Sequence, residues 1–354
     1  PGEPLLGFYE AGSRDVLEIE RCIAHHPDIE RVLASFRGNI AKHPALIEHL
    51  RFIDARRGER DGASARREAV VVLTLCMNHR LEFQEAWERE ALALAKSIQA
   101  DLDSDAGADD IGKVCLGLHL DVGTHGPAIL SGDFIEVFQE TTSPQEVGDV
   151  VIDVPPKAFF QVNPPQLART HALMRAWLED LSDGVLVDLY CGVGGHGLAL
   201  AQGRRVIGVD MSLEAIAAAR QAAERHGIDG RFEVLRDDDA DVAAELDALL
   251  GGQELAAIVV NPARAGLHPS LMPWLASKRD AIDALLYLSC EPQTLTRDLI
   301  RLQRAGFAIE KAQPIDMMPN TDQVETLVKL VRGSDTSEGE GATPIEHAFG
   351  AARG

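Results

Sequence analysis

The sequence predicts an α/β fold in which a smaller α+β domain precedes a domain with a doubly wound, mostly parallel sheet. Two observations carry this prediction. From Gln166 onward, short continuous apolar runs alternate regularly with stretches of helical periodicity, whereas the pattern before residue 154 is mixed. Strands that are apolar on both faces need helices on both sides of the sheet, which crossover connections between parallel strands supply. The 354 residues are enough for two domains of ordinary size.

The first domain, residues 1–154, combines short strand-like runs with helical stretches. The strand-like runs are Ala69–Met77, Val114–Leu120 and Phe134–Phe138. A helix is expected over Gln84–Ala100, where apolar residues recur at helical spacing. The acidic segment Asp101–Asp110 that follows is expected to be a loop.

The second domain, residues 155–332, alternates strands and helices. The predicted strands are Val185–Leu189, Arg205–Val209, Arg231–Leu235, Ala256–Val260 and Ala284–Ser289. The predicted helices are Pro165–Leu181, His196–Gln202, Ser212–His226, Leu271–Lys278 and Thr294–Ala305. The polar, glycine-rich tail at residues 333–354 is expected to be disordered.

The overall charge argues against non-specific binding of nucleic acid. The formal net charge of −22 predicts weak attraction to phosphate, although it is compatible with a local cationic surface. Several arginines gather in one stretch, where we expect either a patch that binds a polyanion or a solvated loop of mixed charge. These arginines are Arg51, Arg56, Arg57, Arg60, Arg66 and Arg67.

Cysteine usage and hydropathy predict a cytoplasmic protein. The five cysteines are scattered and form no CxxC pair, which argues against a zinc ribbon or a disulfide framework and for a reducing compartment. No apolar run is long enough to span a bilayer. The opening residues have neither a basic region nor an apolar core, so no signal peptide is expected. No metal site is expected.

Glycines and polar residues follow the predicted strands in an arrangement typical of a nucleotide-cofactor site. Strand Val185–Leu189 runs into Tyr190 and a glycine-rich turn, which lets the backbone approach a ligand. The next strand leads to Asp210, whose carboxylate suits both ribose hydroxyls of a nucleoside. These features fit either a nicotinamide dehydrogenase or an S-adenosylmethionine methyltransferase. Asn261 and Pro262 follow the fourth strand, and an Asn–Pro there is typical of methyltransferases.

Two further strand ends add to this site. Asp237 and Asp238 follow the third strand, where a polar side chain can meet an adenine. Strand Ala284–Ser289 delivers Cys290 at its tip, in the crevice where ligands bind in open α/β folds. Cys290 is therefore a candidate nucleophile, whereas Cys191 in the glycine turn is expected to pack.

Several segments together resemble the uracil-C5 RNA methyltransferases, the bacterial enzymes that make 5-methyluridine in tRNA and 23S rRNA. The motifs, in family order, are KAFFQVNP (Lys157–Pro164), DLYCGVGG (Asp188–Gly195), VNPARAGL (Val260–Leu267), LSCEPQTLTRDL (Leu288–Leu299) and DMMPNTDQVETLVKL (Asp316–Leu330). The opening segment LLGFYEAGSRDVLEIERC is similar to the start of the family's central domain. The resemblance implies a Rossmann-like methyltransferase domain at residues 155–332, preceded by an RNA-facing α+β domain.

The resemblance also implies a covalent mechanism. Carbon 5 of uracil is a poor nucleophile, and addition of a thiolate to carbon 6 turns it into an enolate that can attack a methyl group. Cys290 is the implied nucleophile, and Glu325 is the implied base that then removes the proton from carbon 5.

The remaining candidate residues bind the methyl donor and the target base. The residues implied to line S-adenosyl-L-methionine are Gln161, Tyr190, Asp210 and Asn261. Phe159, or its neighbour Phe160, is implied to stack on the uracil, and Arg264 to support the enolate oxygen or a phosphate. RNA is the implied partner, with no membrane, and a monomer is expected.

The chain departs from the family pattern at several positions. Asn261 stands where most members have Asp, and one rRNA-modifying branch carries Asn there, which points to 23S rRNA. In addition, Ala263 replaces a Pro, His196 an aromatic residue, Glu291 an Asn and Gln323 a His.

Many members hold a 4Fe–4S cluster through four cysteines, of which only Cys22 has a counterpart here, so no 4Fe–4S cluster is expected in this chain. Three alternatives remain open from the sequence. A tRNA uridine-C5 methyltransferase shares the same motifs, and an exocyclic-amine methyltransferase fits Asn261–Pro262. A catalytically decayed RNA-binding factor fits the replacements at Ala263 and Gln323.

Overall fold

The computed structural model describes residues 5–10, 13, 15–61, 67–78, 83–104, 111–120 and 132–333. The chain divides into two compact units. One unit contains Pro1–Gln145 and Asp153–Lys157, and the other contains Glu146–Ile152 and Ala158–Gly354. The tail that was expected to be disordered lies outside the described residues from position 334 onward. Among the described residues, no helix is long and apolar enough to cross a membrane.

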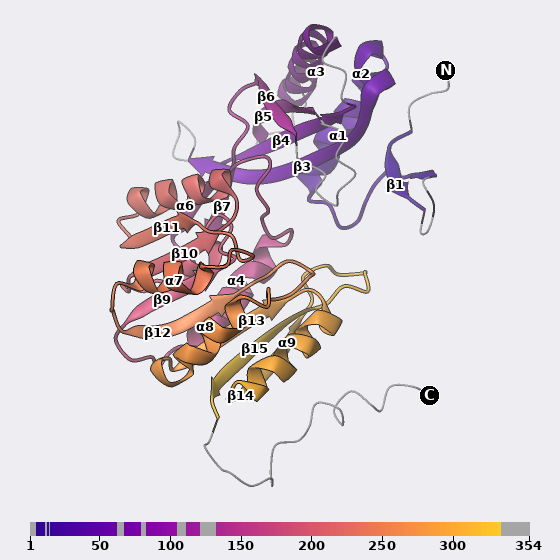
Figure 1. Ribbon diagram of the computed structural model, residues 1–354. Coiled ribbons are helices and arrows are strands. Elements are labelled where there is room, and N and C mark those ends of the chain that lie inside the picture. The colour runs from indigo at the N-terminus through magenta and orange to yellow at the C-terminus, as the bar shows by residue number, and fades with distance from the viewer. Residues whose placement is uncertain are drawn as a thin grey trace, which may run out of the picture. The chain divides into compact units, whose positions relative to one another are not determined.

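The first unit is an α+β arrangement around one sheet (Figure 1). Its strands, in spatial order, are β3 (Leu50–Asp61), β4 (Arg67–Met77), β5 (Ile111–Leu120) and β6 (Asp133–Phe138). The β4–β5 pair is parallel and the outer pairs are antiparallel. The helices are α1 (Pro27–Ile40), α2 (Pro44–His49) and α3 (Gln84–Ser104), and a short hairpin of β1 (Gly7–Tyr9) and β2 (Val16–Glu18) precedes them. Phe36 of α1 and Trp87 of α3 share one core with Leu73 of β4.

Helix α3 continues to Ser104, so the first residues of the predicted acidic loop are helical. The buried face of α3 explains this extension, because Leu102 packs in the same core as Trp87 and Leu94. Residues 105–110 lie outside the described residues.

The arginine-rich stretch is a strand rather than a solvated loop, because Arg51, Arg56, Arg57 and Arg60 all lie in β3. Several of these charges are compensated. Arg56 lies 2.8 Å from Asp54, Arg57 lies 2.7 Å from Asp28, and Arg60 lies 3.2 Å from Glu140. Such pairing weakens the attraction of this strand for a polyanion. Arg66 and the side chain of Arg67 lie outside the described residues.

The large sheet of the second unit has the order β11-β10-β9-β12-β13-β15-β14 (Figure 1). The parallel strands are β9 (Val185–Leu189), β10 (Val206–Asp210), β11 (Gly230–Val234), β12 (Leu255–Val260) and β13 (Ala284–Ser289). The antiparallel strands are β14 (Phe307–Ile315) and β15 (Glu325–Arg332). The doubly wound, mostly parallel sheet is therefore confirmed, and the sequence did not predict β14 and β15.

Helices cover both faces of this sheet. They are α4 (Pro164–Trp177), α5 (Gly195–Leu200), α6 (Leu213–Arg225), α7 (Val242–Leu250), α8 (Leu271–Lys278) and α9 (Pro292–Arg304). Trp274 of α8 and Leu299 of α9 share a core with Val187 of β9. The adjacent residue Asp188 points to the other face, where its carboxylate accepts a hydrogen bond from α5. The predicted helices are confirmed with ends that differ by a few residues, and α7 was not predicted.

The hairpin of β7 (Ser143–Val147) and β8 (Val150–Val154) contains the division between the two units. Its turn uses Gly148 with φ of 64°, a left-handed conformation that favours glycine. The Val151 amide donates to His226 Nε2 at 3.0 Å, which ties residues 146–152 to the second unit.

Candidate active site

The parallel strands of the second unit bring the candidate residues to one edge of the sheet. Leu189 of β9 pairs with Val209 of β10 and with Val260 of β12, so these strands end at the same level. The residues at or directly after the strand ends are Tyr190, Asp210, Asn261 and Cys290. Strand β15 runs in the opposite direction and begins at this edge with Glu325.

Cys290 and Glu325 come together through the register of β13 and β15. Ser289 pairs with Thr326, so the next positions along the two strands are Cys290 and Glu325. Burial raises the pKa of the Cys290 thiol, the Glu325 carboxylate raises it further, and the Arg264 guanidinium acts in the opposite direction. The site thus joins a thiol, a carboxyl group and a guanidinium.

Glu325 itself is almost fully buried, with 5% of its surface exposed. Its Oε2 atom has no hydrogen-bond partner among the described residues. Burial raises the pKa of this carboxyl group, because desolvation disfavours the charged form. A poorly solvated carboxylate is a stronger base than a solvated one.

Helix α9 holds the loop that carries Arg264. Thr294 donates to the Arg264 carbonyl oxygen at 3.0 Å, and Arg297 donates to the Ala265 carbonyl oxygen at 2.7 Å. The buried Asp298 carboxylate accepts from the Leu267 amide at 2.8 Å. These helix residues were not predicted from the sequence to have a role, although they lie in the motif LSCEPQTLTRDL, which was the available signal.

Asp210 fixes the glycine turn after β9. Its Oδ2 accepts from the Gly192 amide and its Oδ1 from the Ser212 amide, both at 2.9 Å. Each carboxylate oxygen has a second lone pair that stays available for a ligand hydroxyl. Gly192 adopts φ of 52°, and a Cβ built there would meet nothing within 4 Å. The turn therefore leaves open space beside Asp210.

Tyr190 uses its hydroxyl inside the protein. The hydroxyl donates to Asp237 Oδ2 at 2.8 Å and accepts from the His268 amide at 3.1 Å. The side chain thereby links the segments that follow β11 and β12, and only its ring is left to line a ligand. Asp238 pairs with Arg236 at 2.9 Å.

The segment before α4 joins this edge through Asn163. Its side chain caps α4 by accepting from the Gln166 amide, and its Nδ2 donates to the Met317 carbonyl oxygen at 3.2 Å. Just upstream, Gln161 is half-buried and Phe159 is 68% exposed. Phe160 lies 3.8 Å from the position of a Cβ on Gly195. Phe159 is thus the more accessible of the two aromatic rings.

Asn261 is hydrogen-bonded to a buried histidine. Its Nδ2 lies 3.1 Å from His196 Nε2, and His196 Nδ1 lies 3.0 Å from His171 Nε2. From the sequence, His196 was noted only as a departure from the family pattern, and His171 was not predicted to have a role. Their contact depends on the packing of α4 against α5, which no local pattern reveals.

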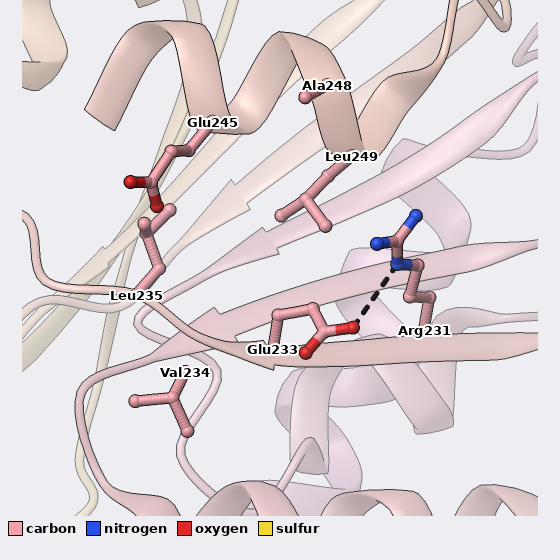
Figure 2. A pocket seen from close by; sticks show the side chains of 7 residues that line it. All are labelled: Arg231, Glu233, Val234, Leu235, Glu245, Ala248 and Leu249. Carbon is pink, nitrogen blue, oxygen red and sulfur yellow. Dashed lines mark hydrogen bonds and ion pairs between the residues drawn. The ribbon is translucent and has the colours of Figure 1, made fainter. Parts of the chain in front are cut away.

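A cavity of about 290 Å³ lies between β11 and α7 (Figure 2). Its charged lining includes Arg231, which contacts Glu233 at 3.3 Å, and Glu245. None of the candidate site residues lines it. The cavity is therefore separate from the group around Cys290.

The thiols of the described residues do not gather. Cys76, Cys115 and Cys191 are buried, while Cys22 and Cys290 are partly accessible, and none of these five described residues forms a disulfide bond. No group of three or more His, Cys, Asp or Glu side chains within the described ranges is arranged to hold a metal ion.

Comparison with known families decides the relationship. The model of the tRNA (uracil-5-)-methyltransferase family matches residues 153–333, about half of the chain. The chain belongs to this family. The matched region contains every candidate site residue, from Phe159 to Glu325.

Individual relatives agree with this membership. An uncharacterized RNA methyltransferase of Geobacter sulfurreducens is 29% identical over 337 residues, covering 93% of this chain and 63% of the relative. The 23S rRNA (uracil(747)-C(5))-methyltransferase of Shewanella pealeana is 38% identical over 210 residues, covering 58% of this chain and 53% of the relative. The chain thus spans between about half and two thirds of the length of these curated relatives.

One solved structure shares the fold of this chain. The Pyrococcus abyssi tRNA (uracil-54, C5)-methyltransferase, in complex with S-adenosyl-L-homocysteine, superposes with a TM-score of 0.64. The match covers 90% of this chain and 70% of that structure at 23% identity. The likeness extends over both units and supports the fold of each.

Proposed function

We propose that this protein methylates carbon 5 of a uridine in RNA, with 23S rRNA as the substrate and S-adenosyl-L-methionine as the methyl donor. The observation that carries the proposal is the register of β13 and β15, which sets Cys290 beside Glu325. Uracil-C5 methylation needs this combination of a nucleophile and a base on one target ring. Membership of the tRNA (uracil-5-)-methyltransferase family supports the same chemistry.

The residues at the sheet edge suit the methyl donor. The Asp210 carboxylate keeps a lone pair on each oxygen for the ribose hydroxyls, and the open space at Gly192 leaves room for the nucleoside. The Tyr190 ring, Gln161 and Asn261 complete the proposed lining. When bound, the donor would supply an activated methyl group, whose bond to sulfur breaks so that S-adenosyl-L-homocysteine leaves.

Cys290 acts first in the proposed mechanism. Its thiolate forms a bond to carbon 6, and the electron pair of the carbon 5–carbon 6 double bond becomes an enolate, so carbon 5 can take the methyl group. The Arg264 guanidinium favours the thiolate, and it is also suited to stabilise the developing enolate oxygen.

Glu325 acts last. Its buried carboxylate takes the proton from carbon 5, the carbon 5–carbon 6 double bond forms again, and the bond between sulfur and carbon 6 breaks. Cys290 leaves as a thiolate and is ready for another turnover. The raised pKa of Glu325 suits this proton transfer, because a desolvated carboxylate binds a proton more tightly.

The expected RNA is 23S rRNA because Shewanella relatives that are 36 to 38% identical carry that substrate in their names. A uridine inside folded RNA must leave its stack to reach a buried thiol, which favours loops and bulges. The exposed Phe159 ring offers a surface on which the extruded base stacks. We propose that the chain acts on this RNA as a monomer.

The direct test uses purified protein, labelled S-adenosyl-L-methionine and two substrates, 23S rRNA and total tRNA. Nucleoside analysis should find label in 5-methyluridine from the rRNA. Label in tRNA alone would show that tRNA, and not 23S rRNA, is the substrate. Label on an exocyclic amine would show that the protein is an exocyclic-amine methyltransferase. If the protein binds the donor and RNA but transfers no methyl group, the result would support a catalytically decayed RNA-binding factor. Mapping of 5-methyluridine in rRNA from a strain that lacks the protein then identifies the nucleotide.

A further inference from the structure

A row of two buried histidines and one half-buried asparagine ends at the candidate active site. Asn261 follows β12, His196 lies on α5 and His171 lies on α4. The two hydrogen bonds in the row measure 3.1 Å and 3.0 Å, and the imidazole rings meet edge to face. His196 is 6% exposed and His171 is 1% exposed. His171 Nδ1 is buried and has no hydrogen-bond partner in the described part of the chain.

The row has a defined direction. The Asn261 Nδ2 atom can only donate, so His196 Nε2 must accept and carry no proton. The proton of His196 is then on Nδ1, which donates to His171 Nε2. The proton of His171 is in turn on Nδ1. Burial lowers the pKa of His196 to about 4 and that of His171 to about 2, so both rings are neutral at pH 7.

This direction decides which end of the Asn261 side chain faces a ligand. His196 accepts one of the two N–H groups of the amide, so the amide nitrogen faces His196 and the carbonyl oxygen points away from the imidazole ring. We propose that His196 and His171 are positioning residues that hold the Asn261 carbonyl oxygen toward the sulfonium group of bound S-adenosyl-L-methionine. The inference rests on the proposed function for the identity of that ligand.

The chemistry of the donor gives this orientation its value. A carbonyl oxygen carries partial negative charge and stabilises a cationic sulfonium group, whereas the opposite orientation of the amide would present N–H groups to it. S-adenosyl-L-homocysteine has a neutral thioether at the same place. The row should therefore favour the donor over the product, which also helps the product to leave after transfer.

The first test measures the tautomers without any ligand. Protein labelled with ¹⁵N-histidine gives long-range nitrogen–proton correlations that show which ring nitrogen carries the proton, and spectra of His196→Phe and His171→Leu assign the signals. At pH 7 both rings should be neutral with the proton on Nδ1. A proton on His196 Nε2 would reverse the row and overturn the inference.

The second test compares the affinities for S-adenosyl-L-methionine and S-adenosyl-L-homocysteine by titration calorimetry. His196→Phe removes the acceptor and should weaken binding of the donor about tenfold, with a change below about twofold for the product. His196→Gln places an amide oxygen near the position of Nε2 and should restore most of the preference. His171→Leu frees His196 to change tautomer and should lower the preference as well.

A control and two outcomes complete this test. His226→Gln alters a half-buried histidine whose Nε2 accepts from the Val151 amide of β8, and it should change neither affinity. If His196→Phe lowers the affinities for both ligands equally, the role of His196 is merely structural. If the affinity for the donor is unchanged, His196 has no role in binding the donor. Absence of 5-methyluridine in the RNA assay would overturn the proposed function. The histidine tautomers and the two ligand affinities would still decide whether His196 and His171 position Asn261.

Discussion

Ser289 of β13 pairs with Thr326 of β15, and this single pair of backbone positions sets Cys290 and Glu325 next to each other. Both strands are largely buried, so their register is specified by the hydrophobic face on each side. Backbone hydrogen bonds therefore place the thiol and the carboxyl group, and either side chain can be replaced while the other keeps its position.

The proposed roles of Cys290 and Glu325 predict different amounts of a covalent protein–RNA adduct when each residue is replaced. Cys290→Ala should abolish methylation, because carbon 5 never becomes an enolate without thiolate addition. Glu325→Gln should allow methyl transfer but stall elimination, since the proton on carbon 5 remains. A denaturation-resistant protein–RNA adduct should build up with Glu325→Gln and be missing with Cys290→Ala and with the double variant. Uridine methylation by Cys290→Ala would exclude the covalent mechanism.

The reactivity of the Cys290 thiol should move in opposite directions in two variants. Burial is the first cause of its raised pKa, Glu325 raises it further, and Arg264 lowers it. Glu325→Gln should therefore shift the pH profile of alkylation by iodoacetamide to lower pH, and Arg264→Gln should shift it to higher pH. Mass spectrometry of the peptide with Cys290 follows the reaction separately from other thiols. Identical profiles in both variants would contradict this electrostatic arrangement.

Asp188 should make the stability of the protein depend on pH. The side chain is fully buried, its Oδ2 accepts from the Gly197 amide at 2.7 Å, and burial raises its pKa from 3.8 to about 7. The folded state thus favours the protonated form, and stability is lost as pH rises from about 4 to about 7. Such a shift corresponds to about 4 kcal/mol of unfolding free energy.

Urea unfolding of Asp188→Asn and the unchanged protein measures this effect. The variant should be more stable by up to about 4 kcal/mol at pH 8.5, and the difference should shrink toward zero near pH 4. Curves that stay parallel across this pH range would show that Asp188 does not retain its proton in the fold.

Asp210→Ala should weaken binding of S-adenosyl-L-methionine by about tenfold or more, because hydrogen bonds to a charged group contribute about 1.5–3 kcal/mol. Ser212→Ala serves as the control. It removes the side-chain cap of α6 and leaves the Asp210 carboxylate, so it should reduce stability by about 1 kcal/mol with little change in affinity. Titration calorimetry that gives the same affinity for Asp210→Ala as for the unchanged protein would remove Asp210 from the cofactor site.

Gly266 is the position where the loop with Arg264 is most sensitive to a methyl group. It adopts φ of 77°, and a Cβ there would lie 2.3 Å from Asp298 Oδ2. Gly203 has φ of 83° with nothing within 4 Å, so it is a matched control. Gly203→Ala should cost about 1–2 kcal/mol of stability from left-handed strain alone. Gly266→Ala should cost more and should also lower kcat, and equal effects of the two substitutions would separate the loop from catalysis.

The sequence predicted the parallel strands because each is a continuous apolar run, such as LAAIVV in β12. It missed β3 and β14 because both strands carry charged side chains, and some of these charges are paired only by residues distant in sequence, as Arg57 is by Asp28 and Glu310 is by Lys329. Cys290 and Asp210 could be anticipated from their places at strand ends. The proximity of Cys290 to Glu325 could not be predicted, because it depends on the insertion of β15 beside β13. His171 was missed for the same reason, since its role appears only when α4 packs on α5.

The position of β15 has a consequence for protein synthesis. It is the last strand of the described chain, yet it lies between β13 and β14 in the sheet. A ribosome synthesises the chain from its N-terminus, so Cys290 is made before Glu325, the proposed base. A nascent chain that ends before Glu325 lacks both the strand that pairs with β13 and the proposed base. The proposed activity is therefore expected only after β15 has been translated and has paired with β13.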